Sequence, residues 1–188
     1  MNEKISKFDE LALNSIRENI RFFQEMSLAR LSTLFTEKDK KGEAAQLIIL
    51  DVAPQDHEFI SSRAPYRTIV ETIDIDPSSG ATYICDITLN TGIEENRFDV
   101  IFCTEVLEHV SNPFLAIKEI SRILKPGGWL FASSPFGFRI HGPLPDNWRF
   151  TEHGWRELLN NFSQVEITAL QDKNRFLMPL HYTVAAKK

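Results

Sequence analysis

Hydrophobic residues follow two different repeats along this chain of 188 residues. Over residues 8–36, apolar side chains recur at intervals close to multiples of 3.6, with charged side chains between them, which predicts a long amphipathic helix. The charged segment 37–43 that follows is typical of an exposed linker. From residue 47 onwards the apolar residues come in short runs separated by polar segments, which predicts a succession of strands.

Seven of these runs have the apolar or β-branched composition of strands. They cover residues 47–50, 68–73, 82–85, 98–103, 129–134, 165–170 and 182–186. A helix is predicted over residues 113–124, where Ser111 or Asn112 can cap the first turn and Glu119 is expected on the solvent face. Another helix fits residues 151–162. Because strands alternate with helices, the chain is expected to form a parallel, helix-covered sheet.

The composition is that of an ordinary globular domain, with 43% hydrophobic and 25% charged residues. The net charge of −5 offers no basic surface of the kind that duplex-binding proteins need, so no nucleic acid duplex is expected as a partner. Two cysteines, Cys85 and Cys103, are too few for a disulfide framework. The sequence shows neither the apolar run of a signal peptide nor a stretch of about 18 apolar residues, which predicts a cytoplasmic protein without a membrane span.

Aspartates stand at the ends of the first three predicted strands, at Asp51, Asp74 and Asp86. Ligands of parallel sheets bind at the carboxyl ends of the strands, and a carboxylate can accept both hydroxyl groups of a ribose. Asp74 follows Asp51 by 23 residues, which fits the position of a ribose-binding acid. The alternative is that these aspartates end the strands only because they favour turns.

Six short segments carry a resemblance to a known family. They are Ile49–Val52, Thr72–Pro77, Ile84–Ile87, Phe98–Ile101, Glu105–Val110 and Ile123–Gly128. In this order and spacing the chain resembles the class I S-adenosylmethionine-dependent methyltransferases, specifically those with a small "type 11" methyltransferase domain. The resemblance covers residues 45–165 and is most specific from Phe98 to Gly128.

The resemblance implies an α/β, Rossmann-like fold with helices on both faces of a seven-stranded, mostly parallel sheet and an extra N-terminal helix. The last strand would run antiparallel, and the N-terminal helix would cover the sheet near the active site. One domain would span residues 1–188, with a helix and linker over 1–43, the cofactor-binding half over 44–134 and the substrate loop, helix and last strands over 135–188.

The resemblance also implies a set of cofactor contacts. The turn after Asp51 would bind the methionine part, Asp74 with Ile75 the ribose, and Asp86 with Ile87 the adenine. The remaining cofactor positions would be Ala53, Pro54, Cys103, Thr104 and Glu105. Methyl transfer from S-adenosylmethionine would leave S-adenosylhomocysteine as product.

One segment departs from the family pattern, because the turn over residues 51–57 contains no glycine. Glycine would let the backbone approach a ligand closely and adopt a positive φ. Either Ala53 and Pro54 still form a compact turn, with Gln55 or His57 supplying polar contacts, or the pocket is degraded and the chain is an inactive binding or scaffold protein. A nicotinamide-dependent oxidoreductase is disfavoured, because no G-x-G-x-x-G follows the first strand.

The segment 135–150 is rich in Pro, Gly and aromatic residues and is expected to be a functional loop. His141 is the candidate general base, and Asp146 would orient it or act as the base itself. Arg139 and Arg149 could clamp an anionic group of the substrate, and Trp148 could form an apolar wall. The alternative makes His141 a surface turn residue and pairs Arg149 with a carboxylate.

His109 is a further candidate for substrate contact, and its alternative role is a hydrogen bond to the backbone. No metal ion is expected, because His57, His109, His141 and His153 do not have the spacing of ligand pairs. The predicted function is methyl transfer to a small-molecule or sugar-related acceptor. The aromatic loop and the N-terminal helix are each a candidate interface for a homodimer.

Overall fold

The computed structural model describes residues 5–34, 46–56, 58–65, 67–172 and 175–188. Its helices are α1 (Lys7–Leu34), α2 (Phe59–Arg63), α3 (Pro113–Ile123) and α4 (Glu152–Leu158). Its strands are β1 (Leu47–Val52), β2 (Thr68–Asp74), β3 (Tyr83–Ile84), β4 (Phe98–Thr104), β5 (Leu124–Pro135), β6 (Gln164–Leu170) and β7 (His181–Lys187). The predicted linker over 37–43 lies outside the described residues.

The seven strands form one sheet in the order β3-β2-β1-β4-β5-β7-β6. The pairs from β3 to β5 are parallel, and β7 runs antiparallel to both of its neighbours. The predicted sheet with an antiparallel last strand is therefore confirmed. Because β1 and β4 lie side by side and run in the same direction, the turns that follow them meet at one edge of the sheet.

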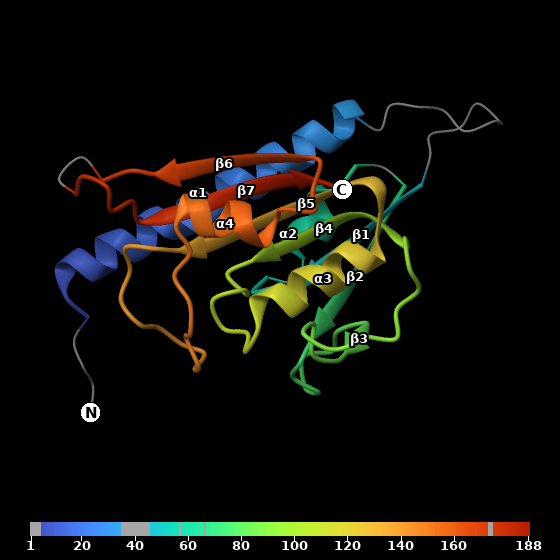
Figure 1. Cartoon of the computed structure of the whole chain (residues 1–188), viewed down its shortest axis with the longest axis horizontal. Coiled ribbons are helices and arrows are strands. Elements are labelled where there is room, and N and C mark those ends of the chain that lie inside the picture. Colours follow the sequence, from blue (N-terminus) through green and yellow to red (C-terminus); the bar gives the residue numbers. More distant parts are fainter. Residues whose placement is uncertain (1–4, 35–45, 57, 66, 173–174) are drawn as a thin grey trace.

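Helices cover both faces of this sheet (Figure 1). The face of Ile49 and Phe102 packs against Leu28 and Leu31 of α1 and against α2. The opposite face packs against α3 and α4 in a larger core, in which Trp155 is fully buried. The alternation of side chains along each strand thus supplies two apolar layers, as expected for a sheet covered on both sides.

Local sequence signals fix where the helices begin. Asn112 caps α3, since its side chain accepts hydrogen bonds from the N–H groups of Phe114 and Leu115. Thr151 caps α4 in the same way through the N–H of Gly154. The helix ends were predicted less well, because α4 ends at Leu158 and α3 at Ile123.

Two details of the α3 prediction were wrong. Leu124 does not belong to the helix but begins β5, where it pairs with Phe98 of β4. Glu119 is buried rather than solvent-facing, with 7% of its surface exposed. Its carboxylate accepts hydrogen bonds from Thr91 and from Arg122, and these contacts outweigh burial and lower the pKa of Glu119 to about 2.

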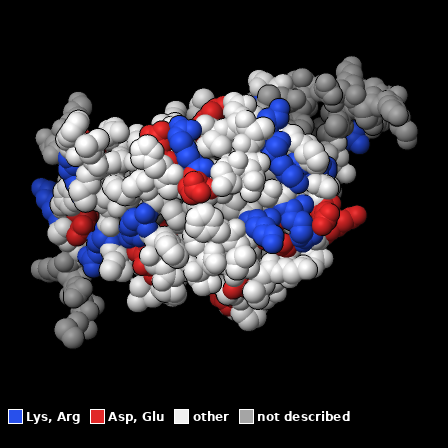
Figure 2. Space-filling view, in the orientation of Figure 1, with Lys and Arg blue, Asp and Glu red and all other residues white. Residues whose placement is uncertain are grey.

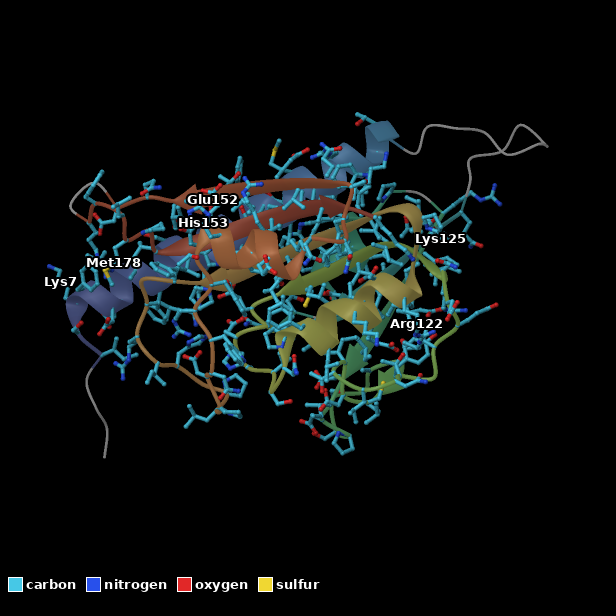
Figure 3. All side chains as sticks on the ribbon, viewed as in Figure 1. Lys7, Arg122, Lys125, Glu152, His153 and Met178 are labelled. Atoms are coloured by element: carbon cyan, nitrogen blue, oxygen red, sulfur yellow. The ribbon has the colours of Figure 1, made fainter. Side chains whose placement is uncertain are left out.

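We expect Glu119→Ala to lower the free energy of unfolding by about 2 kcal/mol, because it leaves the Thr91 N–H and the Arg122 guanidinium without their acceptor. Urea unfolding at pH 7 measures this change. The matched control is Glu152→Ala, which removes an exposed helical pair with Arg156 and should cost under about 0.5 kcal/mol. Arg122 and Glu152 are labelled in Figure 3. Equal effects of the two substitutions would contradict a structural role for Glu119.

Candidate active site

A pocket opens at the carboxyl ends of β1 and β4, with about 760 Å³ of space when the part open to solvent is included. The enclosed part of this pocket is about 210 Å³, which is smaller than the roughly 300–1,000 Å³ usual for ligand pockets. Its lining residues are Arg17, Ile20, Arg21, Gln24, Asp51, Pro54, Gln55, Asp56, Phe59, Thr104 and Glu105. The N-terminal helix α1 therefore forms one wall of the pocket that the strand ends predict.

The glycine-free turn after β1 adopts a conformation that usually favours glycine. Ala53 has a φ of +48°, in the left-handed region, and its N–H donates to the carbonyl of Ile73 at the end of β2. Glu105, at the end of β4, has a φ of +56°. A residue other than glycine in the left-handed region has a conformational energy roughly 1–2 kcal/mol above its usual one. The contacts of the surrounding sheet must therefore hold the turns at Ala53 and Glu105 in place.

Asp51 brings a nearly buried carboxyl group to the pocket, with 3% of the residue exposed. Burial raises the pKa of Asp51 to about 7, because the charged form loses its hydration. The guanidinium groups of Arg17 and Arg21 belong to the opposite wall. The pocket therefore presents acidic and basic side chains to the same space.

The other acids predicted to bind cofactor lie along the same sheet edge but do not line this pocket. Asp74 ends β2, and its Oδ1 accepts a hydrogen bond of 2.9 Å from the N–H of Asp76. Asp86 follows β3 and accepts hydrogen bonds from the N–H and the hydroxyl of Thr88, both at 2.8 Å. The Cys85 N–H donates to the Asp74 carbonyl, which holds the two strand ends together.

Three further predicted positions differ in burial. Ile75 is exposed, whereas Ile87 and Cys103 belong to the hydrophobic core. Burial raises the pKa of the Cys103 thiol, so this cysteine is held in its neutral form. Of the residues predicted at the end of β4, the pocket is lined by Thr104 and Glu105.

Glu105 is the centre of a buried hydrogen-bond chain. Its Oε1 accepts from the Ser133 hydroxyl at 2.7 Å and lies 2.7 Å from Nε2 of His181. The Asn19 side-chain amide, 2.9 Å from Nδ1 of His181, can only donate through its nitrogen, so Nε2 carries the proton that is donated to Glu105. Burial opposes ionisation, but His181 and Ser133 outweigh it and lower the pKa of Glu105.

His181 was not among the sequence candidates. It is completely buried at the start of β7, and only the sheet order brings it to β4. The sequence could have pointed to His181 only through its place directly before the apolar run of the last predicted strand.

The loop after β5 brings His141, Asp146 and Arg149 together. Both the backbone N–H and Nδ1 of His141 lie 3.0 Å from Oδ2 of Asp146. Arg149 binds both oxygens of the same carboxylate, at 2.5 and 2.7 Å. Burial of Asp146 is outweighed by Arg149 and His141, which hold its pKa well below the usual value. The ionised Asp146 therefore accepts from Nδ1–H of His141 and leaves its Nε2 as the unprotonated nitrogen of the neutral ring.

This loop is fastened to the segment after β4. The backbone N–H of Asn147 donates to the Glu108 carbonyl at 2.7 Å, and the Trp148 indole donates to the Val110 carbonyl at 2.9 Å. The ring of Trp148 stacks on Phe150, which is buried in the core. These hydrogen bonds hold the loop against residues 108–110, just beyond the carboxyl end of β4.

The two arginines of the loop have different surroundings. The fork of Arg149 is occupied by Asp146, as the pairing alternative expects. Arg139 is exposed, and its Nη1 lies 3.8 Å from the carboxylate of Asp9 on α1. On the face in Figure 2, basic and acidic side chains are interspersed rather than gathered by sign.

Glu108 and His109 complete this group. The Glu108 side chain is completely buried, and neither carboxylate oxygen has a hydrogen-bond partner among the described residues. Its pKa is raised well above the usual value by burial and by the nearby charge of Glu105. His109 Nδ1 lies 2.9 Å from the Pro145 carbonyl, and its Nε2 lies 3.7 Å from Glu108. Glu108 was missed as a site residue, although it stands three positions after Glu105 in the resembling segment.

Comparison with known proteins places this geometry in a family. A family model described as a methyltransferase domain matches residues 32–132. Ubiquinone biosynthesis O-methyltransferase of Paraburkholderia phytofirmans is 27% identical over 149 residues, which are 70% of this chain and 62% of the relative. The corresponding enzyme of Thiobacillus denitrificans is 49% identical over 38 residues, 20% of this chain and 16% of the relative. This chain thus spans about 62% of the length of the relatives that it matches over 149 residues.

Solved structures share the fold at low identity. The DszA carbon methyltransferase matches with a TM-score of 0.66 and 18% identity, over 89% of this chain and 54% of that one. The 1,6-didemethyltoxoflavin-N1-methyltransferase of Burkholderia thailandensis, solved with bound 1,6-didemethyltoxoflavin and S-adenosylhomocysteine, matches with a TM-score of 0.59 and 16% identity, over 100% of this chain and 93% of that one.

Within the described ranges, no helix has both the length and the apolar character needed to cross a bilayer. The matched family model covers more than half of the chain, and methyltransferases of known structure share its fold. The chain therefore belongs to the class I S-adenosylmethionine-dependent methyltransferase family.

Proposed function

We propose that this chain transfers a methyl group from S-adenosylmethionine to a hydroxyl group of a small, phenolic or sugar-related molecule. The observation that carries the proposal is the placement of His141. Its imidazole is oriented by Asp146, and its Nε2 lies 3.8 Å from Oε1 of Glu108, three residues after the pocket-lining Glu105. A proton acceptor therefore stands beside the pocket, and the relatives named O-methyltransferases support oxygen as the acceptor atom.

The charges of the pocket fit the amino-acid end of S-adenosylmethionine. Arg17 and Arg21 can bind its carboxylate, and Asp51 can bind its ammonium group, whose charge favours ionisation of this buried acid. The turn through Ala53 and Pro54 supports this end of the cofactor, since it adopts the positive φ without glycine. When bound, S-adenosylmethionine supplies a methyl group on a positively charged sulfur, which is already activated for transfer.

The remaining parts of the cofactor are assigned along the sheet edge. We assign the ribose hydroxyls to Asp74 and the adenine to the surroundings of Asp86, because these acids end the next strands in spatial order, β2 and β3. Residues 44–134 would then form the cofactor-binding half and residues 135–188 the acceptor half of one domain over residues 1–188, with α1 as a wall shared by the pocket.

On the acceptor side, Nε2 of His141 takes the proton from the acceptor hydroxyl. Asp146 holds the ring in the required tautomer and stabilises the imidazolium that forms, and Arg149 keeps this carboxylate ionised. We assign contacts with the acceptor to Arg139 and Trp148, whose side chains are exposed on this loop. Catalysis then depends mainly on positioning of the two reactants.

Calorimetric titration with S-adenosylhomocysteine tests the cofactor site. Wild type should bind it and should not bind NAD. We expect Asp74→Ala to weaken binding by about 10–100-fold, because the ribose loses a charge-assisted hydrogen-bond acceptor.

Asp76→Ala is the matched control, since this neighbouring acid is exposed and accepts from Ser78. Its affinity should stay within about twofold of wild type. Unchanged affinity of Asp74→Ala would overturn the ribose assignment. A folded wild type that binds no S-adenosylhomocysteine would overturn the proposed function and favour a binding or scaffold protein.

The raised pKa of Asp51 predicts a pH dependence of stability in the cofactor-free protein. Between the ordinary aspartate pKa of 3.8 and the raised pKa of about 7, the folded state keeps a proton that the unfolded chain releases, so the free energy of unfolding falls as pH rises through this window. The substitution Asp51→Asn removes the ionisable group. We expect it to reduce the decrease in the free energy of unfolding by about 4 kcal/mol, as measured by urea unfolding at pH 4 to 8. Parallel pH profiles of the variant and wild type would contradict the assignment.

We expect His141→Ala to lower turnover by about 100-fold or more and to leave the affinity for S-adenosylhomocysteine within about twofold. Turnover is measured as S-adenosylhomocysteine released with the phenolic or sugar hydroxyl compound that wild type methylates fastest in an acceptor panel. His153→Ala, which removes an exposed histidine on α4, is the control and should keep full activity. Full activity of His141→Ala would refute its role in proton removal.

A further inference from the structure

The carboxylate of Glu108 is buried and has no hydrogen-bond partner among the described residues. Its side chain has no exposed surface, and neither oxygen accepts a hydrogen bond. An ionised carboxylate in such surroundings is strongly unfavourable unless a proton or a cation accompanies it. The side chains next to the Glu108 carboxylate therefore determine whether a proton or a cation can accompany it.

Two imidazole rings face Glu108 with their Nε2 atoms. The Nδ1 atom of His109 lies 2.9 Å from the Pro145 carbonyl, and that of His141 lies 3.0 Å from the Asp146 carboxylate. Both partners can only accept, so each Nδ1 carries the hydrogen and each neutral ring has its lone pair on Nε2. These two lone pairs lie 3.7 and 3.8 Å from Oε1 of Glu108.

Three electron-pair donors thus point toward one another, and neither imidazole ring places a hydrogen atom between them. The donor atoms of Glu108, His109 and His141 all lie within 4.8 Å of one another, and the two rings are 5.0 Å apart between centroids. The spacing is too long for hydrogen bonds but leaves room for a metal ion at about 2.0–2.2 Å from each donor after a small contraction.

We propose that Glu108, His109 and His141 bind a divalent transition metal ion. Two imidazoles and one carboxylate form an open ligand set that suits Zn²⁺ or Fe²⁺ and leaves positions for water or substrate. The nitrogen donors favour these ions over Mg²⁺, which prefers oxygen ligands. The spacing along the sequence gave no indication of this site, because 32 residues separate the two histidines and only the loop contacts bring them together.

Neighbouring groups orient the proposed ligands through hydrogen bonds. Metal-binding histidines usually donate their second N–H to a carboxylate or a backbone carbonyl, as His141 does to Asp146 and His109 does to Pro145. Arg149 holds Asp146 through both oxygens. The metal ion would therefore join the segment after β4 to the loop after β5.

A consequence for the reaction rests on the proposed function. An acceptor hydroxyl at an open position of the metal ion would lose its proton to solvent water more readily, because the cation stabilises the alkoxide or phenolate. His141 would then act as a ligand in the metal-loaded protein and as the proton acceptor in the metal-free protein.

The test uses the full chain without an affinity tag, freed of metal by a chelator and titrated with Zn²⁺ against a chromophoric competitor. We expect one Zn²⁺ per chain in wild type. Glu108→Gln, His109→Ala and His141→Ala should each weaken binding by about tenfold or more, and His153→Ala should not. Co²⁺ in place of Zn²⁺ should give a visible absorption band that the three ligand variants lose.

Two outcomes would overturn the proposal: no Zn²⁺ binding by folded wild type, or equal binding by wild type and the ligand variants. Glu108→Gln keeps the size of the side chain and is expected to fold. If a histidine variant does not fold, the Zn²⁺ affinity of Glu108→Gln compared with wild type still tests the proposal. Titration of the same samples with S-adenosylhomocysteine separates the two proposals. Cofactor binding without Zn²⁺ binding overturns the metal site alone, and Zn²⁺ binding without cofactor binding supports the metal site while overturning the proposed function.

Discussion

The buried contact between Glu105 and His181 holds together the parts of the molecule on which the site depends. Glu105 directly follows β4, Ser133 belongs to β5, His181 begins β7, and Asn19 extends the chain of hydrogen bonds to α1. A charged group in this position is stable only while its partners stay in place. The wall that α1 contributes to the pocket and the positive φ of Glu105 therefore depend on one buried network.

The carboxylates of this protein fall into two groups by their surroundings. Glu119 and Asp146 bind arginines, Glu105 binds His181, and each of these acids has a lowered pKa. Asp51 and Glu108 are buried and have a raised pKa. Asp51 is the penultimate residue of β1 and Glu108 follows β4 by four residues, so both lie near the carboxyl edge, where ligands of parallel sheets bind. Among the described residues, these two buried acids with a raised pKa are the ones at which we place a positively charged ligand group.

The order of elements was predictable because it depends on local periodicity. Six of the seven strands were predicted within two residues of their observed ends, whereas β5 begins at Leu124, five residues before its predicted start. Asn112 and Thr151 cap their helices as their residue types suggest. The error at Glu119 has a tertiary cause, since a helix position that is polar by sequence is buried by the loop that carries Thr91. Helix ends such as Leu158 were uncertain because no single residue type forces the chain to leave a helix there.

The sequence by itself determined the family, the sheet and the acids at the strand ends, since these follow from apolar periodicity and from motifs confined to a few residues. It also indicated His141 and Asp146, because both lie in one short loop. Only the tertiary structure decided that His181 meets Glu105 and that Glu108, His109 and His141 face one another. These contacts join segments that are distant along the chain, and their geometry is set by strand order and loop packing, which a pattern of neighbouring residues does not encode.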